Sequence, residues 1–430
     1  MKPFQAVLLV IFAVLAMFAV FLFATFSGGG NKSVGHVVIW GSLPQTLIDG
    51  VINTTRVSAN ELKDVDYVYV PEDQLVGNLV EAIAGGKAPD LVLFPASSLA
   101  AEKDKLQPIS YRSLSRRSFQ DTFVQAGETF LASDGIYGLP FYIDPYVTYW
   151  NRSIFSAGGA ARAPKYWDEF TDIAPRLTKK TDAGTLTQSA VALGEWDNIV
   201  GAKDILVSLI TALGNPIIKY DASGAPYIAL AERADDGTTP AESALLFYTA
   251  FADPTGTAYA WNRSQPNSRD AFVGGLLGVY LAPASELTSI RAANPNLNFD
   301  VAAYPQSRDG EPAVPATLYA LAIPRGAANP TGALSVAGVL SGSDAQKALA
   351  EATGLPSVRR DMLTVSPDNP YESIFRDAAL NAFIFPDPDP AATDAIFKRM
   401  VENVSSGKLR ISEAVRSAQG ELETLIGRVQ

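Results

Sequence analysis

The sequence has 430 residues, of which 47% are hydrophobic and 18% charged, so it is long enough to build two lobes and too apolar to be disordered. Its formal net charge of −11 argues against binding of nucleic acid, which requires clustered lysine and arginine. The absence of cysteine excludes disulfides, thiolate metal sites and a cysteine nucleophile, and the only histidine, His36, precedes an apolar run, where we expect a strand edge and not a catalytic triad.

Residues 6–26 form an apolar run without a charge, which as a helix would span about 30 Å, the thickness of the hydrocarbon core of a membrane. A cleaved signal peptide is the alternative, but its apolar part is normally about 7–15 residues long and ends in small residues, unlike Ala24-Thr25-Phe26. Lys2 precedes the run, and the positive-inside tendency puts that end in the cytoplasm. We therefore predict a single-pass cell-membrane anchor at residues 1–27, a flexible tether at 28–35 and an extracytoplasmic body.

After the tether, short β-prone runs alternate with helical segments. The predicted strands are residues 36–40, 67–70 and 91–94, and the predicted helices between them are residues 45–55 and 75–83. Such units build a parallel sheet by right-handed crossovers, and ligands bind at the carboxyl ends of its strands. The residues at those ends with suitable side chains are Trp40, Ser42 and Ser97.

Residues 135–155 contain an unusual proline pattern. Pro140 and Pro145 bracket a stretch that we expect to form neither a regular helix nor a central strand, because proline lacks the N–H that either would need. Residues 146–150 are strongly β-prone again. We interpret the segment as a strand that crosses from one lobe to another, with Asp144 near the crossing point.

Further strands are predicted in the second half of the chain, at 190–193, 276–281, 299–303 and 317–323. The first of them ends just before Glu195 and Trp196, which begin a predicted helix. Tyr280 and Tyr319 lie within two of the later strands. Beyond Asn329 the pattern is mostly helical, and the final helix carries an apolar stripe.

Several segments, in this order, resemble the family 1 extracellular solute-binding proteins, which serve ABC importers and include the maltose-binding proteins. The block from Tyr137 to Phe155, with its Gly-Leu-Pro and Asp-Pro steps, looks like the family's "YGLP…DP…YYN…F" pattern. Residues 164–170, 272–286 and 354–361 are similar to its later helix start, strand and turn. Together the similar segments cover nearly all of the chain after the tether, although the lipobox cysteine and the cleaved signal of most family members are missing.

The resemblance implies a type II periplasmic-binding-protein fold, an α/β architecture of two lobes joined by strands that cross the hinge. It also implies capture of a small ligand by hinge closure, no enzymatic activity, no cofactor, and an ABC transporter permease as partner. The expected domains after the anchor and tether are lobe 1 at 36–143, lobe 2 at 144–298, a return to lobe 1 at 299–342, and C-terminal helices mainly of lobe 2 at 343–430.

The resemblance places the ligand where strand ends meet the crossing, and the candidate contacts are Trp40, Ser42, Ser97, Asp144, Glu195, Trp196, Tyr280 and Tyr319. Aromatic faces stack on sugar rings and carboxylates accept hydrogen bonds from hydroxyls, so we expect a sugar or oligosaccharide ligand. An acidic cleft would equally suit a cation. Each residue also has an ordinary alternative role, since the aromatic side chains could pack in a core and the carboxylates could cap a helix or fix a hinge.

Other functions stay open on sequence grounds. The same fold and anchor would suit a surface sensor or adhesion module, because a tethered receptor need not diffuse. Asp144 and Glu195 could instead form the carboxylate pair of a glycosidase, which would need carboxyl groups about 5–9.5 Å apart and one pKa raised by burial. The sequence contains no phosphate loop, metal-ligand cluster or dinucleotide fingerprint, which agrees with a binding protein without a cofactor.

Overall fold

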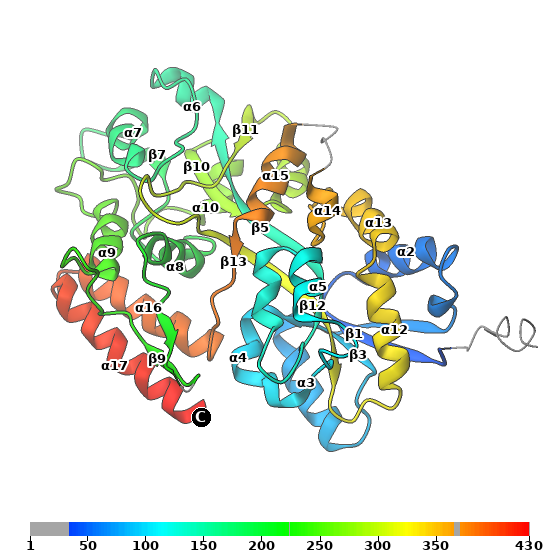
Figure 1. Ribbon diagram of the computed structural model, residues 1–430. Coiled ribbons are helices and arrows are strands. Elements are labelled where there is room, and N and C mark those ends of the chain that lie inside the picture. Colours follow the sequence, from blue (N-terminus) through cyan, green and yellow to red (C-terminus); the bar gives the residue numbers. More distant parts are fainter. Residues whose placement is uncertain (1–33, 223, 365–369, 430) are drawn as a thin grey trace, which may run out of the picture.

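The computed structural model describes residues 34–222, 224–364 and 370–429, which form two α/β lobes side by side (Figure 1). The predicted membrane anchor at 1–27 and most of the predicted tether at 28–35 lie outside the described residues. Among the residues that are described, no helix has the length and apolar character needed to cross a membrane. The anchor accordingly stays a prediction from the sequence.

Lobe 1 is built on parallel strands from the front of the chain. β1 (Val37–Gly41) pairs in parallel with β2 (Val65–Tyr69) on one side and with β3 (Leu91–Pro95) on the other. Helices α2 (Gln45–Arg56) and α3 (Glu72–Ala84) connect the strands. β3 is buried along its whole length, as expected for a strand with neighbours on both edges and both faces. The carboxyl ends of β1 and β3 meet at one edge of the lobe.

Later segments complete lobe 1 around this sheet. α13 packs on α2, and α12 packs on the crossing strand β12. These and the smaller elements are α4 (Leu99–Glu102), β4 (Leu106–Gln107), α5 (Arg116–Thr122), α12 (Pro330–Leu340), α13 (Ser343–Thr353) and α14 (Arg360–Leu363). The lobe therefore combines the N-terminal third of the chain with a segment that returns from far along the sequence.

Strands β5 (Leu139–Asn151) and β12 (Val314–Pro324) pair antiparallel and run from one lobe into the other. The prediction that Pro140 and Pro145 keep their segment out of a central strand is wrong, because β5 lies inside the sheet and both prolines have partners in β12. The register between the strands shifts at Tyr319, so the ladder is irregular near the prolines. An irregular ladder tolerates a missing N–H where a regular one would not, and each proline still offers its carbonyl as an acceptor.

Lobe 2 continues the same sheet beyond β5. β10 (Leu277–Pro283) pairs antiparallel with β5 and in parallel with β7 (Leu186–Val191), and β11 (Phe299–Ala302) also pairs with β5. The short strand β6 (Lys179–Lys180) pairs with β7, and β8 (Ile218–Tyr220) and β9 (Pro226–Ile228) form a separate hairpin. The helices of lobe 2 are α6 (Arg152–Ala157), α7 (Glu169–Leu177), α8 (Ala202–Ala212), α9 (Pro240–Ala250), α10 (Ser268–Val273), α11 (Glu286–Ala293), α16 (Pro390–Ser405) and α17 (Ile411–Val429).

The described residues form two hydrophobic cores, one in each lobe. On β5, Ile143 belongs to the lobe 1 core and Tyr146 to the lobe 2 core; on β12, Val314 belongs to lobe 2 and Leu318 to lobe 1. We therefore propose that the chain crosses between the lobes within these two short intervals. We propose that the second crossing lies later than the expected boundary at 299, since Val301 packs in the lobe 2 core.

A further connection follows α15 (Pro370–Leu380) and runs through β13 (Ala382–Phe383), which pairs with β12. The proline-rich segment after it is fastened to lobe 2 by Asp387, whose side chain is 3% exposed. The Asp387 carboxylate pairs with Lys203 of α8 at 2.8 Å and accepts the Thr393 hydroxyl of α16. This buried ion pair fixes where the connection enters lobe 2.

Candidate functional site

Trp40 and Ser42 lie at the carboxyl end of β1, and Ser97 lies in the single helical turn Ala96–Ser98 that follows β3. All three are half-buried, and the ring of Trp40 packs against the lobe 1 core. The Ser42 hydroxyl is itself buried and lies beside the Tyr319 hydroxyl, without a hydrogen bond of normal geometry to the described residues. A buried hydroxyl without a partner costs free energy, so Ser42 is a group that a bound molecule could satisfy.

Tyr319, on β12, connects this edge of lobe 1 to the crossing strands. Its buried ring is tilted against that of Tyr142 on β5, with 6.0 Å between the ring centroids. Its hydroxyl donates to Glu72 at the start of α3 at 2.7 Å. Burial raises the pKa of Tyr319, and the neighbouring Ser42 hydroxyl partly offsets that rise. Tyr319 therefore contacts residues of elements that are far apart in the sequence.

Asp144 lies on β5, between the two lobes, and only 6% of it is exposed. Its Oδ1 accepts the backbone N–H of Ser285 in lobe 2 at 3.0 Å, and no lysine or arginine among the described residues pairs with it. Burial raises the pKa of Asp144 from 3.8 to about 6, although hydrogen bonds from Ser285 act in the opposite direction. A buried carboxylate without a cation is costly, and groups of this kind concentrate at functional sites.

These contacts join residues of both lobes into one group, which we call the hinge cluster: Ser42, Glu72, Tyr142, Asp144, Ser285 and Tyr319. Tyr142 links its two halves, because its ring meets that of Tyr319 and its pKa is raised by burial and by the charge of Asp144. The sequence interpretation missed Glu72, Tyr142 and Ser285. Tyr142 could have been found, since it stands two residues before Asp144 and so points to the same face of the strand.

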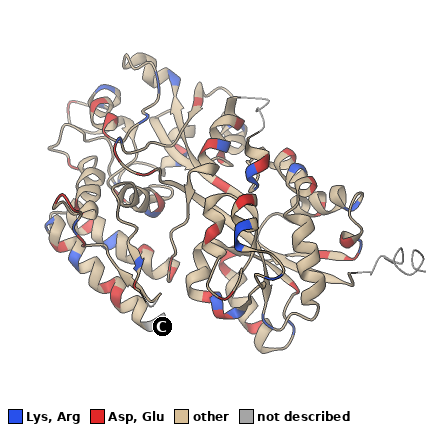
Figure 2. Ribbon diagram, viewed as in Figure 1, with Lys and Arg blue, Asp and Glu red and all other residues tan. Residues whose placement is uncertain are grey.

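The charges of the hinge cluster are unbalanced. Asp144 and Glu72 supply carboxylates, and the cluster contains no lysine or arginine. The guanidinium of Arg269, on α10, is held by Glu286 at 2.7 Å. In the ribbon of Figure 2, acidic and basic residues are interspersed along the chain in both lobes. An electronegative site of this kind favours ligands rich in hydrogen-bond donors over anions.

Glu195 and Trp196 follow β7 and make their contacts with other parts of lobe 2. The Glu195 carboxylate lies 3.4 Å from the guanidinium of Arg263, and the Trp196 indole N–H donates to Asp394 at 3.3 Å. Both residues are buried. Neither is joined to the hinge cluster by these contacts, so their role in ligand binding stays a prediction.

Tyr280 lies on β10 in the core of lobe 2. It is 2% exposed, and its ring packs against those of Tyr149 and Phe272 at centroid distances of 6.0 and 5.7 Å. Its hydroxyl is buried and finds no hydrogen-bond partner in the described part of the chain. The ring therefore contributes to packing, whereas contact with a ligand stays a prediction.

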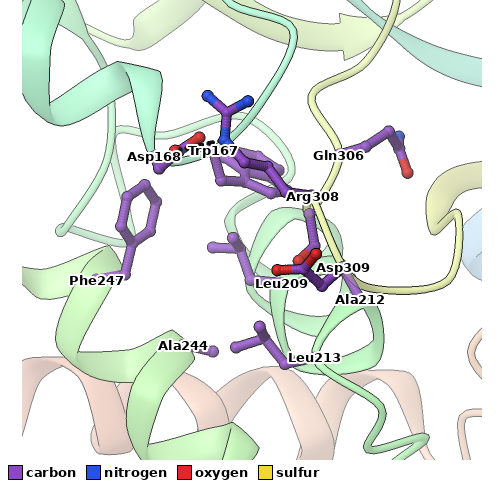
Figure 3. A pocket seen from close by; sticks show the side chains of 11 residues that line it. Trp167, Asp168, Leu209, Ala212, Leu213, Ala244, Phe247, Gln306, Arg308 and Asp309 are labelled. Carbon is purple, nitrogen blue, oxygen red and sulfur yellow. Dashed lines mark hydrogen bonds and ion pairs between the residues drawn. The ribbon is translucent and has the colours of Figure 1, made fainter.

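Two cavities of a size that suits a small molecule lie away from these residues. One of about 300 Å³ lies within lobe 2, where Leu209 and Phe247 contribute apolar walls and Arg308 pairs with Asp168 at 2.7 Å beside Trp167 (Figure 3). A larger one of about 710 Å³ lies between the lobes. None of the residues predicted to contact the ligand lines either cavity.

Comparisons with solved structures show the same fold in proteins of low sequence identity. A cyclo/maltodextrin-binding protein complexed with maltotetraose is 17% identical with a TM-score of 0.74, and the match covers 93% of this chain and 98% of that one. The cyclic α-maltosyl-1,6-maltose binding protein of Arthrobacter globiformis is 16% identical with a TM-score of 0.73, covering 92% and 99%. UgpB of Mycobacterium tuberculosis, in complex with glycerophosphocholine, is 19% identical with a TM-score of 0.71, covering 92% and 99%.

The sequence itself was also compared with protein families and with curated proteins. The search of curated proteins gave no significant match. The family model described as bacterial extracellular solute-binding protein matches residues 59–374, which is most of the chain and includes β5, β12 and most of the hinge cluster. The chain therefore belongs to the family of bacterial extracellular solute-binding proteins.

Proposed function

We propose that this protein captures a sugar or oligosaccharide at the hinge cluster and delivers it to an ABC importer. The observation that carries the proposal is the position of Asp144, a buried carboxylate without a cation on the strand that joins the lobes. Several structural neighbours are complexed with oligosaccharides, among them maltotetraose and mannotriose. A polyhydroxylated ligand supplies the donors that this carboxylate lacks.

The aromatic rings of the hinge cluster suit the C–H faces of a sugar ring, and its carboxylates suit the hydroxyl groups of the sugar. Tyr142 is half-buried and so offers part of its ring for stacking, and Glu72 is exposed beside the Tyr319 hydroxyl. Sugar hydroxyls donate to carboxylates, while their C–H faces pack on aromatic rings. An anionic ligand would meet two negative groups here and is disfavoured.

Capture by this site requires lobe closure. Ser42 and Glu72 belong to lobe 1, and Ser285 belongs to lobe 2, so a ligand in contact with all three bridges the hinge. Such a ligand favours the closed arrangement only by the difference between its affinities for the closed and open states. We propose further that the N-terminal segment 1–27 holds the body at the membrane near the permease.

The test is a thermal-shift screen of the full chain in detergent against sugars, oligosaccharides, polyamines and amino acids. At a ligand concentration about 100 times Kd, a true ligand stabilises the fold by about 2.7 kcal/mol. We expect the best sugar to lose its effect in Asp144→Ala and in Glu72→Ala but to keep it in Asp121→Ala, which removes a carboxylate from an exposed helix. A hit that survives both cluster substitutions, or turnover of the bound sugar, would contradict the proposal.

Localisation is tested separately by membrane fractionation. The full chain should remain with the membranes after a high-salt wash, whereas a chain that begins at residue 34 should be released. Release of the full chain would remove the anchor from the proposal and leave solute binding unaffected.

A further inference from the structure

The cavity between the lobes has features of a binding site of its own. Its volume of about 710 Å³ falls within the roughly 300–1,000 Å³ typical of small-molecule pockets, which often form between domains. Lobe 1 contributes Leu99 of α4 and Phe130, the connection after β13 contributes Ile384, and lobe 2 contributes Tyr220 of β8 and Ile426 of α17. Figure 1 shows α4 on one side of this space and β9 with the C-terminal end of α17 on the other.

The walls are mainly apolar, but the charged groups among the lining residues are mostly cationic. The lining includes two cationic residues, Lys103 and Arg116, and one carboxylate, Glu128, although the net charge of the chain is −11. Glu128 already accepts the side-chain amide of Gln120 at 2.9 Å, and Lys103 lies 3.4 Å from Asp134. Arg116 is exposed, and its guanidinium makes no ion pair or hydrogen bond with the described residues. The Arg116 guanidinium is therefore available to bind an anionic ligand.

The cavity within lobe 2 has no such unpaired cation. Its guanidinium, that of Arg308, is bound to Asp168 at 2.7 Å and lies 4.3 Å above the ring of Tyr166. A ligand there would have to displace an existing ion pair, whereas a ligand between the lobes would gain a new one. The interlobe cavity thus combines apolar walls from both lobes with a cation that has no partner.

We propose that the interlobe cavity is a second ligand site, separate from the hinge cluster, for a small amphiphilic anion such as an alkyl or aromatic carboxylate. The apolar part of the ligand lies between Leu99 and Tyr220, and the carboxylate binds Arg116 at the rim. No member of the hinge cluster lines this cavity, so the two sites do not share a contact residue. The charge preference is also opposite, because the hinge cluster is electronegative and this rim is electropositive.

Octanoate is the probe that tests the proposal, with octylammonium as a control of equal chain length and opposite charge. Binding of both is measured by isothermal titration calorimetry to the full chain in one detergent, so that partition into the detergent cancels between variants. We expect octanoate to bind more tightly than octylammonium. Arg116→Glu should weaken the binding of octanoate by about fivefold or more. Arg117→Glu should not, because the Arg117 side chain is 92% exposed and does not line the cavity.

The lobe 2 wall is tested by the same titration. Tyr220→Ala should weaken the binding of octanoate. Tyr227→Ala should not, because Tyr227 lies on the same hairpin but outside the cavity. Asp144→Ala should leave octanoate binding unchanged, which separates this site from the proposed solute site. Equal binding of octanoate and octylammonium, equal effects of the two arginine substitutions, or full binding by Tyr220→Ala would each overturn the proposal.

Discussion

Asp144 lowers the stability of the unliganded protein, and the substitution Asp144→Asn should show this. The pKa of Asp144 is raised by burial from 3.8 to about 6. The folded state therefore holds this proton more tightly than the unfolded state, so the contribution of Asp144 to stability is most favourable below pH 4 and becomes unfavourable as the pH rises through 6. A shift of about two pKa units corresponds to about 3 kcal/mol at neutral pH. Asparagine removes the charge and keeps an oxygen that can accept the Ser285 N–H.

The expected result is a stability difference that depends on pH. At pH 7.5, Asp144→Asn should be more stable than the wild type by up to about 3 kcal/mol, and the gain should shrink towards zero near pH 4. Urea unfolding of both proteins at several pH values, followed by tryptophan fluorescence, measures it. The contributions of other titrating groups cancel when the two stabilities are subtracted. The variant Asp121→Asn, on an exposed helix, shows the effect of removing a carboxylate that is not buried. A difference between the proteins that stays constant from pH 4 to 7.5 would refute the reasoning.

Further predictions concern the packing of lobe 2. Lys203→Met leaves the Asp387 carboxylate, whose side chain is 3% exposed, without its cation, and should lower the free energy of unfolding in urea by about 3 kcal/mol or more; a loss below 1 kcal/mol would contradict this role. Gly201→Ala places a Cβ 2.2 Å from the Tyr146 hydroxyl at a φ of +66° and should cost about 1–3 kcal/mol in the same assay. The control Gly77→Ala, in α3 with open space around it, should instead stabilise by about 0.5–1 kcal/mol.

Much of the fold could be predicted because local patterns and tertiary structure agree. The strands β1, β2 and β3 were placed to within two residues, since each is a β-prone run bounded by polar or breaking residues. The crossing strand β5 was truncated in the prediction, because the rule that removes proline from central strands assumes a regular ladder. The ladder between β5 and β12 has a register shift, which sequence alone does not reveal.

The candidate site was harder to predict, because its contacts join distant parts of the chain. The strand-end rule pointed to Ser42, but the partner of Tyr319 is Glu72, 247 residues away, and an acid at a helix start looks like ordinary helix stabilisation. Tyr280 and Tyr319 look alike in the sequence, as aromatic residues within strands. Their environments differ only through tertiary packing. The Tyr280 ring lies among other aromatic rings, whereas the Tyr319 hydroxyl donates a hydrogen bond to Glu72.

The free-energy cost of burying the Asp144 charge can be compared with the free energy that a ligand could supply. Keeping this carboxylate ionised in its buried position costs about 3 kcal/mol at neutral pH. A hydrogen bond donated to a charged group contributes about 1.5–3 kcal/mol, so one or two sugar hydroxyls are enough to offset the cost. Because Asp144 is bound to Ser285 of lobe 2 and stands beside Tyr142, a ligand that reaches it must enter between the lobes. If Asp144 binds the solute as proposed, the free energy that destabilises the empty protein becomes part of the driving force for binding, and this would account for an acid without a cation at the hinge.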